Sequence, residues 1–382
     1  MGMPQFHPNY PNYQQHPLLP TYERVHAVSD YSGKGVVIAF VDAGFSMHPD
    51  LRGRVIAHVD ATTDDIKEHR HINNTSDLSW HGLMVSSIAM GDGHESAGYY
   101  RGIAHRSKAV LVKVSNPEGE VKEADILRGL EWVLANHARH RIRIVNASVG
   151  GDDVNGDPLY PLHQVVQALT ESGVVVVIAA GNSDGAFLLP PASSSAGIVV
   201  GGYDDQNTDD RQQWKRYHSN YGRAHDGTRK PDLVAPCVWI ASPLLPNTTV
   251  AKQASLLGTY VTTPTSAEHL KRMVRRHHQL FEFTKEQAHQ PNETLYQQLQ
   301  ERVHQYKLIH PKYQHVDGTS VAAPIVSGVV AQLLEANPRL SPQQVKDILC
   351  QTAEPIGQIA RHKQGAGAIN GTKAVQEALA YS

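Results

Sequence analysis

Short apolar runs recur along the chain and alternate with stretches of helical spacing. Five such runs lie at residues 36–41, 109–114, 142–146, 174–180 and 198–200. Runs of this length between glycines and turns are typical of buried strands in a parallel sheet. Between them, residues 123–138 and 163–172 carry apolar side chains every three or four positions, as amphipathic helices do. The alternation predicts a doubly wound α/β sheet covered by helices.

The alternation of predicted strands and helices stops between about residues 245 and 313. Thr265-Ser266-Ala267-Glu268 has the pattern of a capping box that opens a helix, and apolar positions from Leu270 to Phe281 share one helical face. A second apolar series from Leu295 to Tyr306 predicts another helix. We interpret residues 245–313 as a helical hairpin inserted in the domain.

The ends of the chain complete this organisation. Residues 1–20 are rich in Pro, Tyr, Gln and His without periodicity, which predicts an irregular tail. Beyond the insert, residues 320–336, 341–353 and 371–380 predict three further helices. We therefore expect a tail over residues 1–20 and one domain over residues 21–382, interrupted by the insert.

Composition and charge narrow the class of protein. Apolar residues make up 40% and charged residues 19%, as in a soluble globular protein. The formal net charge of −2 gives no argument for a nucleic-acid or membrane partner. Cys237 and Cys350 are the only cysteines, which excludes a disulfide framework. The first residues lack the basic start and apolar run of a signal peptide, so we expect a cytoplasmic location.

Three short segments carry candidate chemistry: Asp42-Ala43-Gly44 after the first strand, His81-Gly82 farther on, and Gly318-Thr319-Ser320 at the start of a helix. Each has an ordinary structural explanation when it is taken alone. The Asp could form a turn, and the Ser could cap its helix. Taken together, they supply a nucleophile, a base and an orienting carboxylate.

The chemistry of acyl transfer needs these three side chains to meet. A serine hydroxyl is a weak nucleophile, so it requires a base within hydrogen-bond reach and a group that orients the base. In open α/β sheets, functional sites lie beyond the carboxyl ends of the strands, where Asp42 stands. A helix start also presents backbone N–H groups to a developing oxyanion. The pattern predicts a catalytic triad of Asp42, His81 and Ser320.

In their Asp, His, Ser order, these segments resemble the signature blocks of the subtilisin family of serine proteases. Further blocks resemble the family in the same order, at residues 102–104, 145–150, 179–182, 219–222, 230–236 and 365–367. The resemblance runs from about Tyr22 to Ala380, apart from the insert. It implies a three-layer fold with a mostly parallel central sheet, and a serine endopeptidase that cleaves polypeptides through an acyl-enzyme on Ser320.

The resemblance also assigns roles to residues beyond the triad. Asn182 would donate its side-chain amide to the oxyanion, beside the backbone N–H of Ser320; the ordinary alternative is a turn residue after Gly181. Ser148, Val149 and Gly150 would bind the main chain of the substrate as an added strand and, with Gly181, border it. The segment from Leu189 to Ala192 would lie near the base of an apolar specificity pocket.

Departures from the family concern the surroundings of the triad. Ala43 replaces a usual Thr or Ser and removes a hydrogen bond to Asp42. Catalysis would need no cofactor, but structural calcium is common in the family, and Asp50 matches a ligand position. A turn-forming role explains Asp50 equally well. Only about 20 residues precede the core, too few for a folding pro-domain, which indicates an intracellular or pro-domain-less member.

Two questions stay open at this point. The insert is basic at Lys271, Arg272, Arg275 and Arg276; this run is either a solvated helix face or a lid or docking arm for substrate or partner. The chain could also be a specialised precursor-processing protease or transacylase, or a catalytically silent peptide-binding module. Loss of a triad member would mark the silent module, and all three members are present.

Overall fold

The computed structural model describes residues 5–70, 78–289 and 292–381. The chain divides into two compact units. The larger unit comprises Leu19–Ile240 and Asp317–Ser382, and the smaller comprises Met1–Leu18 and Ala241–Val316. The smaller unit thus joins the N-terminal segment to the insert.

A nine-stranded sheet forms the centre of the larger unit within the described residues. Its strands are, in spatial order, β11 (Leu233–Pro236), β7 (Ile198–Asp204), β6 (Val175–Ala179), β5 (Ile142–Ala147), β1 (Val37–Asp42), β4 (Lys108–Lys113), β2 (Val55–Asp60) and β3 (Lys67–His69), with β8 (Lys215–Arg216) paired to β7. All pairings are parallel except those of β3 and β8. Every residue of β1 is buried, as its continuous apolar run predicts.

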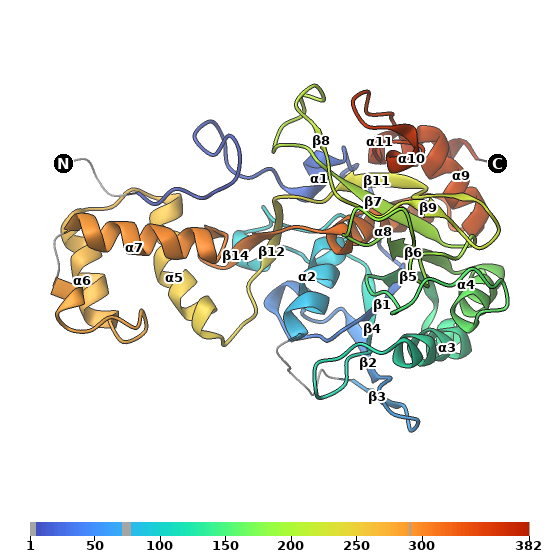
Figure 1. Cartoon of the computed structure of the whole chain (residues 1–382), viewed down its shortest axis with the longest axis horizontal. Coiled ribbons are helices and arrows are strands. Elements are labelled where there is room, and N and C mark those ends of the chain that lie inside the picture. The colour runs from blue at the N-terminus through green and yellow to red at the C-terminus, as the bar shows by residue number, and fades with distance from the viewer. Residues whose placement is uncertain (1–4, 71–77, 290–291, 382) are drawn as a thin grey trace. The chain divides into compact units, whose positions relative to one another are not determined.

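Helices cover both faces of this sheet (Figure 1). On one face lie α3 (Glu123–His140) and α4 (Pro161–Glu171), and on the other lie α2 (Ser79–Met90) and α8 (Thr319–Ala336). Next to α8 pack α9 (Pro342–Thr352) and α11 (Gly371–Ala380). The three-layer α/β fold predicted from the sequence is confirmed. Shorter elements are α1 (Thr21–Arg24), η1 (Pro49–Leu51), η2 (His94–Ser96), β9 (Gly222–Arg223), β10 (Arg229–Lys230) and α10 (Arg361–Gln364).

The central helix α8 owes its hydropathy to burial. It is the one helix among the described residues that is long and apolar enough to cross a bilayer, and 83% of it is buried inside the protein. The strands β5, β6, β7 and β11 pack against it. Its apolar surface is therefore covered by the sheet, as in the core helix of a globular domain.

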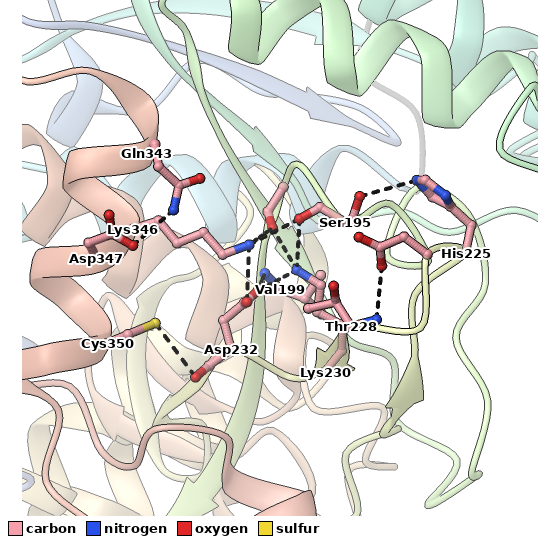
Figure 2. Close-up of polar contacts among 12 residues, drawn as sticks. Ser195, Val199, His225, Thr228, Lys230, Asp232, Gln343, Lys346, Asp347 and Cys350 are labelled. Atoms are coloured by element: carbon pink, nitrogen blue, oxygen red, sulfur yellow. Dashed lines mark hydrogen bonds and ion pairs between the residues drawn. The ribbon is translucent and has the colours of Figure 1, made fainter.

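A buried cluster of charged side chains fastens the loop before β7 to α9 (Figure 2). The Lys230 ammonium lies 2.7 Å from Asp232 Oδ2 and donates to Gly197 O at 2.8 Å. From α9, Lys346 lies 3.1 Å from Asp232 Oδ1 and also donates to Gly197 O, at 3.2 Å. Burial lowers the pKa of Lys230 to about 8, against the attraction of Asp232. The two ammonium groups satisfy carbonyls that would otherwise be buried without a partner.

The smaller unit holds more structure than the predicted hairpin. Two of its helices, α6 (Ala267–His277) and α7 (Asn292–Gln305), match the prediction, and α5 (Thr249–Thr262) precedes them. The apolar positions Ala254, Leu257 and Val261 already have helical spacing in the sequence. The structure shows that all three are buried. A small sheet of β12 (Ile240–Pro243), β14 (Tyr313–Val316) and β13 (Leu308–His310) and the short η3 (Gln287–His289) complete this unit.

The irregular N-terminal segment completes the core of the smaller unit. Phe6 is fully buried there, and its ring centroid lies 5.6 Å from that of Tyr260 and 5.1 Å from that of Tyr296. The Gln300 side chain accepts from His7 N at 2.8 Å and donates to His7 O at 2.6 Å. The segment thus lacks secondary structure and is still anchored, because the Phe6 ring and the backbone N–H and C=O of His7 find partners.

Candidate active site

The carboxylate of Asp42 and the imidazole of His81 form a direct pair. Asp42 ends β1 and is fully buried, and His81 lies in the first turn of α2. His81 Nδ1 and Asp42 Oδ1 are 2.6 Å apart. A carboxylate only accepts, so Nδ1 carries the proton and donates. This tautomer leaves Nε2 as the basic nitrogen, which is the arrangement that general-base catalysis needs.

Glycine at position 82 allows α2 to approach the Asp42 loop. A Cβ at this position would lie 2.1 Å from Gly44 O and 2.7 Å from the Phe45 ring. No side chain fits at such distances without displacing the backbone of the loop. The His-Gly dipeptide is uninformative when it is read alone. In the structure, close packing of α2 against the Asp42 loop explains why a glycine follows His81.

The environment of His81 raises its pKa above the ordinary value of 6.5. Burial alone would lower this pKa, but the negative charge of Asp42 and the hydrogen bond that His81 donates to it outweigh the burial. The Trp80 ring packs edge-on against His81, with centroids 5.4 Å apart. A buried carboxylate that favours imidazolium is what a base needs when it takes a proton during reaction.

The predicted nucleophile lies at the start of α8. Ser320 is the second residue of the helix, after Thr319, and its carbonyl accepts from Ser148 Oγ at 3.2 Å. Ser320 Oγ donates to Ser148 O at 3.5 Å. Within the described residues, no hydrogen bond joins Ser320 to His81. A hydroxyl rotates freely, and catalytic hydrogen bonds often form only with substrate in place.

A short hydrogen-bonded chain links the Ser320 helix to β5. Asn146 Nδ2 donates to Ser148 Oγ at 3.0 Å, and Ser327 Oγ donates to Asn146 Oδ1 at 2.9 Å. All three side chains are buried. The sequence analysis assigned no role to Asn146 or Ser327, although an Asn inside an apolar strand and a Ser inside an apolar helix were visible signals.

The amide of Asn182 is oriented by the first residue of α8. Asn182 Oδ1 accepts from Thr319 N at 2.8 Å and from Thr319 Oγ1 at 3.0 Å. Its Nδ2 donates to no protein atom in the described chain. Both this Nδ2 and Ser320 N lie close to the position that a Cβ on Gly318 would occupy. The structure therefore brings Asn182 to the start of the Ser320 helix with a donor group to spare. Sequence reasoning missed Thr319 as the residue that holds it.

The turn that carries Asn182 depends on a glycine and on a second asparagine. Gly181 has a φ of +98°, and a Cβ there would lie 2.7 Å from Asn220 Nδ2. Asn220 Oδ1 accepts from Ser183 N at 2.8 Å and from Ser183 Oγ at 2.7 Å. Asn220 lies in a segment that the sequence analysis matched to the family without assigning it a function.

The predicted substrate-binding segment leaves the sheet where β5 ends. Ser148 is buried, Val149 half-buried and Gly150 exposed. Gly150 faces the predicted pocket segment, because a Cβ there would lie 3.9 Å from Leu189 Cβ. Gly151 N also donates to Pro190 O at 2.6 Å. The two segments expected to border the specificity pocket are thus neighbours, and the exposed one is free to pair with an extended peptide.

The surroundings of Asp50 do not fit calcium. Its carboxylate accepts from Glu95 N at 3.3 Å and lies 3.6 Å from His48 Nδ1, and its carbonyl accepts from Arg54. These contacts are an amide N–H, an imidazole nitrogen and a guanidinium group, whereas calcium requires six to eight oxygen ligands. Within the described residues, no group of three or more His, Cys, Asp or Glu side chains could hold a metal ion. Calcium at Asp50 stays a prediction without support from this geometry.

A buried carboxylate on an imidazole, together with a serine at a helix start in an α/β fold, defines the class of serine hydrolases. Comparison with known proteins gives the family. The model of the subtilase family, Peptidase_S8, matches residues 33–367. The chain therefore belongs to the subtilase family.

Individual relatives agree with this assignment. The chain is 29% identical over 354 residues to serine protease AprX of Bacillus subtilis strain 168, a match that covers 90% of this chain and 67% of the Bacillus protein. Fervidolysin from Fervidobacterium pennivorans, a keratinolytic enzyme related to subtilisin, has a similar structure with a TM-score of 0.62 and 22% identity over 94% of this chain and 45% of that one. The protease domain of PatA has a TM-score of 0.61 and 21% identity over 93% of this chain and 99% of that domain. The protein is a serine endopeptidase of the subtilisin-like class.

Proposed function

We propose that the protein hydrolyses internal bonds of extended polypeptides through an acyl-enzyme on Ser320. The observation that carries the assignment of the site is the 2.6 Å contact between His81 Nδ1 and the fully buried Asp42. It fixes the tautomer in which Nε2 accepts a proton. No metal or other cofactor takes part in these steps.

The proposed reaction has two halves. His81 Nε2 takes the proton of Ser320 Oγ as this oxygen attacks the scissile carbonyl carbon, and the oxyanion accepts from Ser320 N and Asn182 Nδ2. His81 then gives the proton to the departing amine, which leaves an ester on Ser320. Water then attacks the ester carbonyl carbon while His81 Nε2 takes its proton. His81 returns this proton to Ser320 Oγ, which releases the carboxylic acid and the free serine.

We propose apolar polypeptide segments as the preferred substrates. Ser148, Val149 and Gly150 would pair with the substrate main chain, and Val149 and Gly150 are partly or fully exposed. Three of the exposed large apolar side chains lie within five residues in sequence of Asp42, His81 or Asn182: Met47 at 48% exposure, Trp80 at 40% and Phe187 at 39%. These side chains support the proposal, because an apolar substrate segment would cover them on binding.

The alternatives are not favoured. A silent binding module would lack a member of the triad, and Asp42, His81 and Ser320 are all present. A transacylase would have to keep water from the acyl-enzyme, and the family and the relatives that this chain matches are serine proteases. Product mass separates hydrolysis, which adds one water to the two fragments, from transfer to another amine, which adds none.

The first test is labelling with a fluorophosphonate, measured as intact mass. We expect one adduct on the wild type and none on Ser320→Ala, because only a serine with an activated hydroxyl reacts rapidly. Ser29→Ala is the matched control, since it removes the hydroxyl of an exposed serine outside the predicted site and should still be labelled. Labelling of Ser320→Ala to the same extent, or an unlabelled wild type that stays folded, would overturn the assignment of the nucleophile.

A further inference from the structure

The insert has a charge opposite to that of the rest of the chain. Residues 241–316 contain nine Lys and Arg residues against five Glu and no Asp, which gives a formal charge of +4. Residues 1–18 contain none of these four types. Since the whole chain carries −2, the remaining residues carry −6. A strongly uneven distribution of this kind indicates a charged partner for the basic part.

Helix α6 concentrates this positive charge on its outer side. Its inner side packs into the core of the smaller unit through Leu270, Met273 and Val274. Arg272, Arg275 and Arg276 are exposed on the other side. We call these three residues the arginine face.

The arginine face has no partner of its own within the described residues. Lys271 Nζ lies 3.2 Å from Glu268 Oε1, so that lysine is paired. No ion pair or hydrogen bond to the described residues is found for the guanidinium groups of Arg272, Arg275 or Arg276. Like charges three and four residues apart on a helix repel each other, which an anionic partner would relieve.

We propose that the arginine face binds an acidic segment of the polypeptide substrate, away from the bond that is cut. The identity of this partner as a substrate rests on the proposed function. Along α6 the three residues span about 6 Å, and an extended chain spaces its residues by about 3.4 Å, so a short acidic stretch can meet all three. Guanidinium groups suit this role because they bind carboxylates in a bidentate manner.

A short acidic peptide fits this surface better than a nucleic acid does. Nucleic acids are long polyanions that proteins bind through many phosphate contacts, whereas the arginine face offers only three guanidinium groups. A peptide with a few carboxylates can be neutralised by the arginine face alone. The two classes are separated by the experiment.

The direct test is binding to the whole chain with Ser320→Ala, which prevents cleavage of the probe. The probe is a fluorescein-labelled twelve-residue peptide with six Glu, and its matched control has Gln at the same six positions. By fluorescence anisotropy in low salt, we expect the Glu peptide to bind at least about tenfold more tightly than the Gln peptide, and less tightly as salt rises.

Two triple variants of this Ser320→Ala chain test the location. Arg272→Gln/Arg275→Gln/Arg276→Gln should weaken binding of the Glu peptide about tenfold, since Gln keeps helix propensity and removes only charge. Arg52→Gln/Arg106→Gln/Arg229→Gln removes three exposed charges from the larger unit and should not weaken it. Equal binding by wild-type and α6-variant chains, or tighter binding of a DNA oligonucleotide of equal charge, would overturn the proposal.

A second measurement uses the active enzyme and the same α6 variant. Two fluorogenic peptides share one cleavage sequence, and one of them carries the six-Glu tract beyond a Gly-Ser linker. We expect the tract to lower KM about tenfold in the wild type with kcat unchanged, and to have no effect in the α6 variant. Loss of all cleavage would count against the proposed function, whereas cleavage that ignores the tract counts against the docking surface alone.

Discussion

Asp42 holds His81 through one carboxylate oxygen, while its other oxygen has no hydrogen-bond partner among the described residues. Oδ1 lies 2.6 Å from His81 Nδ1, and Oδ2 is buried without a hydrogen bond to any described residue. Ala43, which replaces a usual Thr or Ser of the family, offers no hydroxyl to it. Burial lowers the pKa of His81, but the negative charge of Asp42 and the hydrogen bond to its Oδ1 outweigh the burial and raise this pKa.

The first prediction concerns the pH dependence of hydrolysis. His81 must be neutral to accept a proton, so kcat/KM should fall as pH drops through a midpoint above 6.5. Asp42→Asn removes the negative charge, so it should move this midpoint to lower pH and reduce kcat by about 10⁴-fold. Rates of peptide cleavage between pH 5 and pH 9 give both values. Asp92→Asn is the control, and a midpoint that Asp42→Asn leaves unchanged would contradict this account.

The second prediction separates two roles of Asn182. If Nδ2 donates to the oxyanion, Asn182→Ala and Asn182→Asp should both reduce kcat by about 10²- to 10³-fold with little change in KM; this magnitude comes from a subtilisin. The Asp variant keeps the oxygen that accepts from Thr319, and it replaces the donor by an acceptor that is negatively charged when ionised. Thr319→Val removes the hydroxyl contact to Asn182 and should cost much less. A nearly active Asp variant would assign Asn182 to positioning instead.

The third prediction concerns acid stability. His58 in β2 is buried, and neither ring nitrogen has a hydrogen-bond partner among the described residues. Burial lowers its pKa to about 4, against the attraction of Asp60. Between pH 6.5 and pH 4 the unfolded chain therefore binds a proton that the folded chain does not, and stability is lost as pH falls.

His58→Leu should remove this loss, which amounts to about 3 kcal/mol at pH 4. Urea unfolding at several pH values gives the free energy of unfolding of each variant. His94→Leu, at an exposed position, is the control and should keep the wild-type slope. An unchanged slope in His58→Leu would show that another group causes the loss.

The fourth prediction concerns the N-terminal anchor. Phe6→Ala should destabilise the smaller unit by about 3–5 kcal/mol, because it empties a site that is fully buried between two tyrosine rings. Hydrogen exchange of the amides in α5 and α7 should then accelerate, while those in β1 and β5 stay protected. His7→Ala, at the exposed neighbouring position, should change neither. Uniform acceleration across the chain would mean that the two units do not unfold separately.

Local patterns determined much of this protein. The apolar runs predicted the strands because both faces of a parallel sheet are buried. Successive side chains, which point to opposite faces, are therefore all apolar. The order of Asp42, His81 and Ser320 predicted the chemistry because acyl transfer needs those side-chain types. The basic run of α6 was equally visible, although its sequence did not say whether it is solvated or bound.

Only the tertiary structure decided how distant residues meet. Asp42 and His81 are 39 positions apart in sequence, and Asn182 and Thr319 are 137 apart. Phe6 is 254 positions from Tyr260, to whose carbonyl it donates. Sequence periodicity reports which face of an element is buried, but not which element covers it. Which elements pack against each other depends on the whole chain. For this reason the N-terminal tail, which has no periodicity, could contribute Phe6 to the core of the smaller unit.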